Sequence, residues 1–152
     1  MNEQFTWLHI GLGSFHRAHQ AWYLHRLQVM GDKRWSIAAG NIRNDAEHVV
    51  QALSAQKGRY VLETVSPEGV SEYEEITSIQ KLIPWQADLQ PLIAEGADPK
   101  TKVIAFTVTE GGYYLNTSHK LEVNNPDLAA DLKGGCKTIY GVITRILEAR
   151  MA

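Results

Sequence analysis

Residues Trp7-Leu8-His9-Ile10-Gly11-Leu12-Gly13-Ser14-Phe15-His16 decide the fold of this chain. The apolar run ends at two glycines one residue apart, and a helix-compatible segment follows at once and continues to about Met30. This order is typical of the first half of a nucleotide-binding unit, because glycines permit a tight turn and the close approach of phosphates. The first helical turn adds free N–H groups and the positive end of the helix dipole. On the glycines alone, a tight turn without a ligand is an equally good interpretation, since His16 stands where the fingerprint has its third glycine.

Length and composition narrow the class of protein. The 152 residues are enough for one domain with a core, and 44% hydrophobic with 21% charged residues predicts a globular chain. A net charge of −2 with both signs interspersed argues against a nucleic-acid surface. The single cysteine, Cys136, excludes an internal disulfide, and the polar start from Met1 to Gln4 carries no signal-peptide pattern. No apolar run approaches the roughly 20 residues of a membrane span, so we expect a cytoplasmic protein without nucleic-acid or membrane partners.

The chain continues as an alternation of strands and helices. Residues 35–42 are apolar nearly throughout, as buried parallel strands are, and Asn44 with Glu47 forms a capping box for a helix that ends at Gly58. This alternation predicts an α/β fold with a mostly parallel sheet. Residues 59–82 are rich in strand formers on both sides of the turn at 66–69, which predicts an inserted β-hairpin. The acidic residues at 72, 74 and 75 are expected on its solvated edge.

The end of the second strand bears on the choice of cofactor. In nucleotide-binding α/β folds this position meets the adenosine ribose, where an acidic residue favours NAD and an arginine accepts the 2′-phosphate of NADP. The sequence supplies both Arg43 and Asp45. Asp45 is also explained as a charge at a helix start, and Arg43 as a solvated cation. The residues themselves leave both cofactors open.

The strongest strand pattern of the chain, at 102–109, leads to a second glycine-containing end, Glu110-Gly111-Gly112. Ligands of open parallel sheets bind beyond the carboxyl ends of the strands, so Thr109 and Glu110 are expected to face the same crevice as the first glycine turn. An ordinary strand-end turn is the alternative. His16 and His19 lie three residues apart without a cysteine or acidic partner nearby in sequence, so we expect no metal site. An amphipathic helix is predicted over residues 136–151.

Two longer motifs resemble those of a known family. Residues 11–20, Gly-Leu-Gly-Ser-Phe-His-Arg-Ala-His-Gln, and residues 107–113, Thr-Val-Thr-Glu-Gly-Gly-Tyr, are similar to the corresponding motifs of the mannitol dehydrogenase family, the polyol-specific long-chain dehydrogenases. The resemblance covers essentially the whole chain and implies that residues 1–152 form a Rossmann-like, NAD-binding domain. With the turn chemistry above, it gives a set of expected cofactor-binding residues: Gly11, Gly13, Ser14, Phe15, His16, Arg43, Asp45, Thr109 and Glu110.

The resemblance also implies a reaction. A family member transfers a hydride from a secondary alcohol of a sugar alcohol to NAD and so forms a ketose. Many mannitol-specific members carry lysine at the position of Gly111, and this departure points away from mannitol. The combination of residues 13–24, 39–45 and 110–115 is most similar to members that oxidise D-arabinitol to D-xylulose; D-mannitol or a related hexonate is the alternative substrate. A non-catalytic nucleotide-binding module is the alternative of another class.

The resemblance further implies a missing part. In the family a strand and a large helical domain follow, and that domain carries a lysine as general base with an asparagine and a histidine. We therefore expect this chain to be the N-terminal part of a longer enzyme, truncated before its last strands and its helical C-terminal domain, without catalytic residues and inactive alone.

Overall fold

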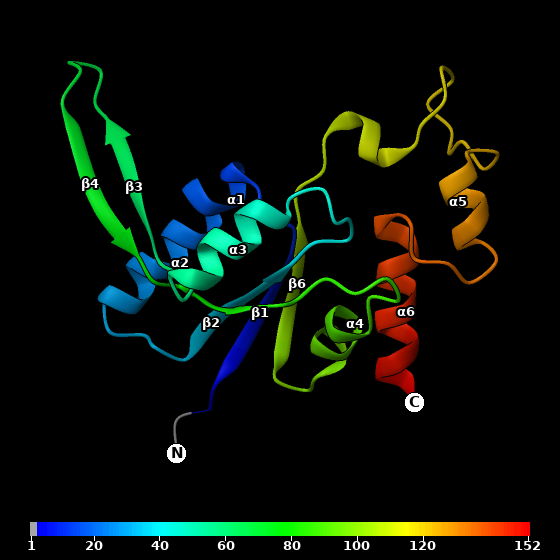
Figure 1. Ribbon diagram of the computed structural model, residues 1–152, viewed down its shortest axis with the longest axis horizontal. Helices are drawn as coiled ribbons and strands as arrows, with labels where there is room; N and C mark the ends of the chain where they lie inside the picture. Colours follow the sequence, from blue (N-terminus) through cyan, green and yellow to red (C-terminus); the bar gives the residue numbers. More distant parts are fainter. Residues whose placement is uncertain (1–2) are drawn as a thin grey trace.

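The computed structural model describes residues 3–152; Met1 and Asn2, the first half of the polar start, lie outside the described residues. Four strands form one parallel sheet in the order β5-β2-β1-β6, with β1 at Phe5–Ile10, β2 at Trp35–Gly40, β5 at Ile79–Leu82 and β6 at Thr101–Phe106. All four therefore place their carboxyl ends along the same edge of the sheet (Figure 1). The predicted parallel α/β fold is confirmed.

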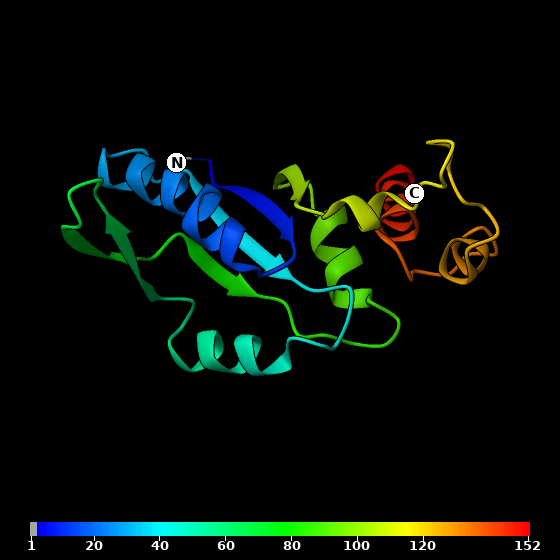
Figure 2. The same ribbon diagram turned by 90° about the horizontal axis from the view of Figure 1, so that it is seen from above.

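Helices cover both faces of this sheet (Figure 2). The helices are α1 (Ser14–Ala18), α2 (Gln20–Val29), α3 (Glu47–Ala55), α4 (Gln90–Ala97), α5 (Pro126–Asp131) and α6 (Ile139–Met151), with a short 3-10 helix, η1, at Glu110–Tyr113. Core residues of α2 and α3 share one hydrophobic cluster, and those of α4 and α6 share the other. No helix within residues 3–152 is long and apolar enough to cross a bilayer.

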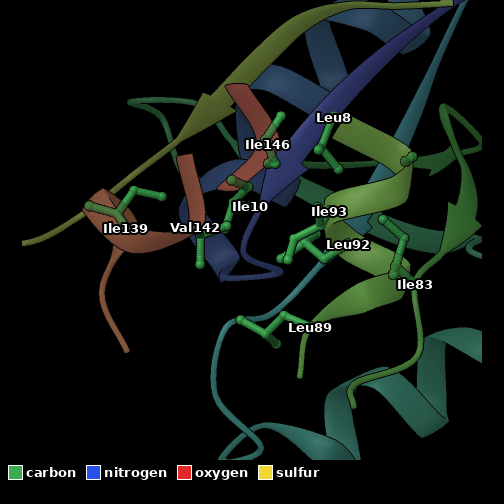
Figure 3. Packing of buried hydrophobic residues seen from close by; sticks show 10 residues of the cluster. Leu8, Ile10, Ile83, Leu89, Leu92, Ile93, Ile139, Val142 and Ile146 are labelled. Carbon is green, nitrogen blue, oxygen red and sulfur yellow. The ribbon is translucent and has the colours of Figure 1, made fainter. Parts of the chain in front are cut away.

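Side chains along β1 point alternately to the two faces of the sheet, so β1 contributes residues to both hydrophobic clusters. Leu8 and Ile10 pack with α4 and α6, as Figure 3 shows, whereas Trp7 belongs to the α2 side. Each fully buried leucine or isoleucine stabilises the fold by about 1.5–3 kcal/mol. The predicted amphipathic helix, α6, approaches α4 so closely that a Cβ on Gly96 would lie 2.7 Å from Cδ1 of Ile146. A glycine is required there for packing.

The predicted hairpin is present as β3 (Tyr60–Val65) and β4 (Ser71–Ile76), which pair antiparallel and extend away from the four-stranded sheet (Figure 1). Its expected second strand, however, divides after Ile76. Ser78 accepts a hydrogen bond from the N–H of Ile37 and donates its hydroxyl to the carbonyl of Ala21 at 2.6 Å. These two bonds direct β5 into the parallel sheet beside β2 instead of into the hairpin.

Glu74 does not lie on a solvated edge as predicted. Its carboxylate accepts hydrogen bonds from Nε1 of Trp22 at 2.8 Å and from Nη1 of Arg26 at 3.2 Å, and it lies 3.5 Å from Nε2 of His25. These donors, led by the indole, hold the pKa of the Glu74 carboxyl below its usual range. Glu74 therefore attaches the hairpin to α2.

Two local predictions about helices are wrong. The first helix is interrupted at His19, whose backbone leaves the helical region (φ −119°, ψ −81°) while its imidazole Nδ1 lies 2.8 Å from the carbonyl oxygen of Phe15. The capping box does not form either: α3 begins after Ala46 without a side-chain cap. Asn44 instead belongs to the loop that follows β2, where neighbouring residues line the cleft described next.

Candidate functional site

A cleft of about 620 Å³ lies at the carboxyl ends of β1, β2 and β6. Gly11 contributes from β1, Arg43 and Asp45 from the loop after β2, and Thr109 from the segment after β6. In a parallel sheet of this order, the strand order reverses between β1 and β6, which is where ligands of open α/β sheets bind. The prediction that Thr109 faces the same crevice as the first glycine turn is confirmed for Gly11, and the structure adds Arg43 and Asp45 to the same lining.

The two glycines of the first turn have different physical roles. Gly11 has φ +126°, a conformation that side chains rarely adopt, and its N–H donates to the carbonyl of Gly40 at 2.7 Å. Gly13 has an ordinary extended conformation (φ −63°, ψ 162°), and a Cβ added to it would meet nothing within 4 Å. Neither the backbone nor the packing requires a glycine at 13. Open space over a turn is what a ligand group approaching the backbone needs.

The next residues lie outside the lining of this cleft. Gly13, Ser14 and Phe15 are exposed, with 58% of Phe15 accessible, so all three are free to contact a ligand. His16, by contrast, is fully buried. Its ring stacks on that of His9 with centroids 3.5 Å apart and planes 9° apart, and its Nδ1 lies 2.9 Å from Oε1 of Gln20. A direct contact between the His16 side chain and a cofactor, as expected from the sequence, does not fit this burial.

The His9–His16 pair carries no formal charge at neutral pH. Burial, followed by the neighbouring His16, lowers the pKa of His9 from 6.5 to about 3. Burial is also the main cause that lowers the pKa of His16, with a smaller contribution from Arg17 and an opposing one from the bond to Gln20. Three of the pair's ring nitrogens, both of His9 and Nε2 of His16, have no hydrogen-bond partner among the described residues.

Arg43 reaches across the mouth of the cleft. Its Nη2 donates to the hydroxyl of Tyr114 at 3.3 Å and lies 3.8 Å from a carboxylate oxygen of Asp127. Both partners also line the cleft. Since 62% of the Arg43 side chain and 46% of the Asp127 side chain are exposed, the ion pair is weak, worth about 0–1 kcal/mol. It nevertheless occupies the one guanidinium in the lining.

The segment after β6 places its two candidate residues differently. Thr109 lines the cleft, whereas Glu110 begins η1, is exposed and is not part of the lining. Gly111, the next residue, does line the cleft, and a Cβ on it would meet nothing within 4 Å.

Residues 3–152 contain no group of three or more histidine, cysteine, aspartate or glutamate side chains placed to hold a metal ion.

The far wall of the cleft escaped the sequence prediction. It is formed by Asp127 at the start of α5 and by Lys137, Thr138 and Ile139 at the start of α6. A signal for α5 was present: Asn125 caps the helix by accepting the N–H of Asp127 at 2.9 Å, and proline occupies the first helical position. That these helix starts face the glycine turn is a tertiary relationship without a local sequence signal.

Asp131 fixes the start of α6. Its carboxylate accepts the N–H groups of Lys137 (2.6 Å), Thr138 (2.9 Å) and Gly141 (3.1 Å) and the hydroxyl of Thr138 (2.7 Å). A Cβ on Gly141 would lie 2.5 Å from Cγ of Asp131, so the glycine is needed for this close approach. Together with the Thr138 hydroxyl, which accepts the N–H of Tyr140 at 3.1 Å, Asp131 satisfies most of the N–H groups at the start of α6 from within the protein.

Comparison with known proteins agrees with this architecture. Residues 6–152 match the family model described as the mannitol dehydrogenase Rossmann domain. The chain is 82% identical over its whole length to D-arabinitol 4-dehydrogenase of Klebsiella pneumoniae and covers 33% of that protein. It is 54% identical over 145 residues, 94% of the chain, to D-arabinitol 4-dehydrogenase of Ralstonia nicotianae, of which it covers 31%. The chain thus spans about a third of the length of the curated relatives it matches.

A solved structure has the same fold. The mannitol 2-dehydrogenase of Pseudomonas fluorescens, determined as a ternary complex with NAD and D-mannitol, superimposes with a TM-score of 0.88 and 30% identity over 99% of this chain and 31% of that one. The parallel sheet, the crevice at its carboxyl edge and the family match over nearly the whole chain lead to one conclusion: this chain belongs to the mannitol dehydrogenase family and forms its Rossmann domain.

Proposed function

We propose that this chain is the NAD-binding part of a polyol dehydrogenase that oxidises D-arabinitol to D-xylulose. The observation that carries the cofactor assignment is Gly13, a glycine that neither conformation nor packing explains, on the turn between β1 and α1. A side chain there would fill the open space over the turn, which is where a pyrophosphate approaches the backbone in this fold. The donor set at the site, backbone N–H groups and a guanidinium beside exposed polar residues, suits a phosphate-containing ligand.

The candidate residues divide by their place along the sheet. Gly11, Gly13, Ser14 and Phe15 would hold the pyrophosphate and the adjoining riboses by their backbone and exposed side chains. Asp45 would accept the hydroxyls of the adenosine ribose, and Thr109, with Glu110 beside it, would contact the nicotinamide half. His16 acts from behind the turn instead of on the ligand, because its side chain is buried.

NAD is the proposed cofactor in preference to NADP. Asp45 in the cleft disfavours a second phosphate on the ribose. Arg43, the residue that could accept such a phosphate, already has the carboxylate of Asp127 and the hydroxyl of Tyr114 as partners. A 2′-phosphate would have to compete with both.

The substrate proposal rests on the relatives. The two proteins with 82% and 54% identity are both D-arabinitol 4-dehydrogenases, whereas the relative solved with D-mannitol is 30% identical. NAD, when bound, supplies the acceptor for the hydride, and the hydroxyl of the substrate must lose its proton to a base. The cleft offers an exposed carboxylate at Asp45, a half-exposed carboxylate at Asp127 and an exposed amine at Lys137, none of them enclosed away from water. We infer that the base belongs to the other two thirds of the relatives' length, where the family resemblance implies a lysine.

The test uses the 152-residue chain in two measurements. NADH should bind with a saturable change in the tryptophan fluorescence, while a mixture of the chain with NAD and D-arabinitol should form no NADH above the uncatalysed rate. Absence of NADH binding would reject the cofactor assignment. Turnover at a rate typical of enzymes, about 1 per second or more, would reject the inference that the base lies elsewhere.

A non-catalytic nucleotide-binding module would pass both of these measurements. Production of the chain joined to the C-terminal two thirds of the Klebsiella relative separates the two functions. Activity of the joined protein with D-arabinitol in preference to D-mannitol supports the dehydrogenase. Binding of NADH without turnover of either polyol would favour the module, and faster turnover of D-mannitol would replace the proposed substrate.

A further inference from the structure

The buried stack of His9 and His16 is not explained by folding alone. Both side chains are completely inaccessible, and three of their four ring nitrogens have no hydrogen-bond partner among residues 3–152. Buried polar atoms without partners destabilise a fold, so an apolar side chain of similar volume would serve the core better. Two histidines in contact at such a place call for a reason beyond packing.

Their position supplies the reason. His9 is the second-last residue of β1 and lies against the turn: a Cβ on Gly11 would be 3.8 Å from Nε2 of His9. His16 belongs to α1, on the other side of the same turn. The chain runs from His9 through the turn at residues 11–13 to His16, and the stacked imidazole rings of the two histidines have their centroids 3.5 Å apart. The stack therefore closes the base of the glycine turn.

We propose that His9 and His16 are positioning residues of the cofactor site, which hold the end of β1 and the start of α1 at the separation that the glycine turn needs to receive the pyrophosphate, and that they do so as uncharged flat rings. The inference rests on the proposed binding of NAD. Neither ring reaches the ligand, so neither is a catalytic residue.

Flat rings suit this task for a physical reason. Two planar groups at 9° and 3.5 Å define a single separation and tilt, whereas branched aliphatic side chains can slide and repack. The hydrogen bond between Nδ1 of His16 and Oε1 of Gln20 fixes the rotation of one ring and extends the support to α2. The turn thereby has a rigid base while its outer surface at Gly13 stays free of side chains.

The surroundings keep both rings uncharged. The charged side chain that acts on His16 is Arg17 of α1, a cation that disfavours a second positive charge nearby. The backbone of Arg17 is held in turn by Tyr60 of β3, which donates its hydroxyl to the carbonyl of Arg17 at 2.5 Å. No carboxylate of the described residues forms an ion pair with either ring. Protonation of one ring would therefore place an uncompensated charge directly behind the turn.

The experiment compares substitutions at His9 by NADH titration of the 152-residue chain. His9→Leu keeps the buried volume and removes two unpartnered nitrogens, so it should fold at least as stably as the wild type, yet bind NADH at least about tenfold more weakly because the flat contact is lost. His9→Phe keeps a flat, uncharged ring of slightly larger size and should retain NADH affinity within about threefold. Leu8→Ala is the matched control: it is equally buried in β1 on the opposite face, so it should lower the melting temperature and leave NADH affinity unchanged below it.

The outcomes separate the two proposals. A wild-type chain that does not bind NADH rejects the proposed function and this inference with it. A wild type that binds, with His9→Leu and His9→Phe of equal affinity, rejects the positioning role alone. Equal losses of affinity in His9→Leu and Leu8→Ala would also reject it, because any weakening of the core would then weaken binding. His16→Leu and His16→Phe should reproduce the difference seen at His9.

Discussion

Gly13 and Gly111 are the two glycines, of twelve in the chain, at which a side chain would be strained neither by the backbone conformation nor by a neighbouring atom. They follow β1 and β6, which are adjacent in the sheet. Every other glycine either has a positive φ or would bring a Cβ within 3.0 Å of another atom. Two glycines without a structural reason thus stand at the two strand ends between which a dinucleotide would lie.

Gly13→Val should separate folding from binding. The extended backbone at Gly13 suits valine, and the space around it is open, so the melting temperature should change by no more than about 2 °C. The isopropyl group would occupy the approach to the turn, and NADH affinity should fall at least about tenfold, a loss of roughly 1.4 kcal/mol. Gly11→Ala is the contrasting variant: it should destabilise the fold, because φ at Gly11 is +126°. Equal NADH affinity in wild type and Gly13→Val would refute the assignment of the turn.

Gly111→Ala should stabilise the protein. Glycine in η1 leaves the unfolded chain with extra conformational freedom, and alanine at a compatible position removes it for a gain of about 0.4–1 kcal/mol. For a chain of this size the gain corresponds to a rise in melting temperature of roughly 1–4 °C, measurable by circular dichroism. Gly112→Ala should have the opposite effect, because its Cβ would lie 2.8 Å from Cβ of Val108. A lower melting temperature for Gly111→Ala would mean that η1 needs a glycine after all.

Asp127→Asn should shift cofactor preference towards NADP. The change removes the carboxylate that pairs with Arg43 and leaves the hydrogen bond to Tyr114 in place. Because the pair is exposed, the ratio of NADP to NAD affinity should rise by only about two- to fivefold. Competition binding at low salt measures the ratio. The double variant Arg43→Ala with Asp127→Asn should not show this increase in relative NADP affinity. If the increase persisted in the double variant, Arg43 would not be the residue that meets the 2′-phosphate.

The buried histidines predict the pH dependence of stability. The pKa of His9 is lowered from 6.5 to about 3, so the unfolded chain takes up this proton first as the pH falls. The stability that the folded state gains from a neutral His9 is complete above pH 6.5 and is lost progressively as the pH falls to about 3. The pKa of His16 is also lowered, so His16 changes the stability in the same direction. The free energy of unfolding should fall by up to ~1.4 kcal/mol per pH unit for each ring within this window, as followed by urea denaturation. His9→Leu should have a shallower slope between about pH 6 and pH 5, and an unchanged slope would contradict the burial of a neutral His9.

The elements that could be predicted from the sequence are those in which burial produces a regular pattern of apolar residues. β1 and β2 lie in the middle of the sheet, bury most of their length and therefore appear as apolar runs, and α6 buries one stripe of a regular pattern. The edge strand β6 is only partly buried but is also an apolar run. The division after Ile76 could not be predicted, because no glycine or proline marks it and the bond from Ile37 to Ser78 decides which sheet β5 joins. The interruption at His19 likewise depends on a side-chain bond to Phe15, which helix propensity does not reveal.

In the candidate site, too, some residues could be predicted from the sequence and others could not. The residues that the motifs identified and that meet in the cleft, such as Gly11 and Thr109, follow strands directly, so the parallel sheet alone brings them together. The partners of Arg43, namely Tyr114 and Asp127, come from the segment after β6, whose path no local pattern determines. The burial of His16 was equally hidden, because its partner His9 looks like an interruption of an apolar strand until the stack is seen.

The carboxylate of Asp131 changes the charge at one of the two helix starts near the cleft. Two helix starts border the cleft region, that of α1 after the glycine turn and that of α6 at Thr138. The carboxylate of Asp131 already neutralises the second, with Gly141 leaving no room between them. The start of α6 therefore has its positive end neutralised from within the protein, whereas the start of α1 has neither a side-chain cap nor an acidic residue in its first turn. Of these two helix starts, that of α1 alone is left to attract an anion, and the carboxylate responsible for this difference lies outside the cleft lining.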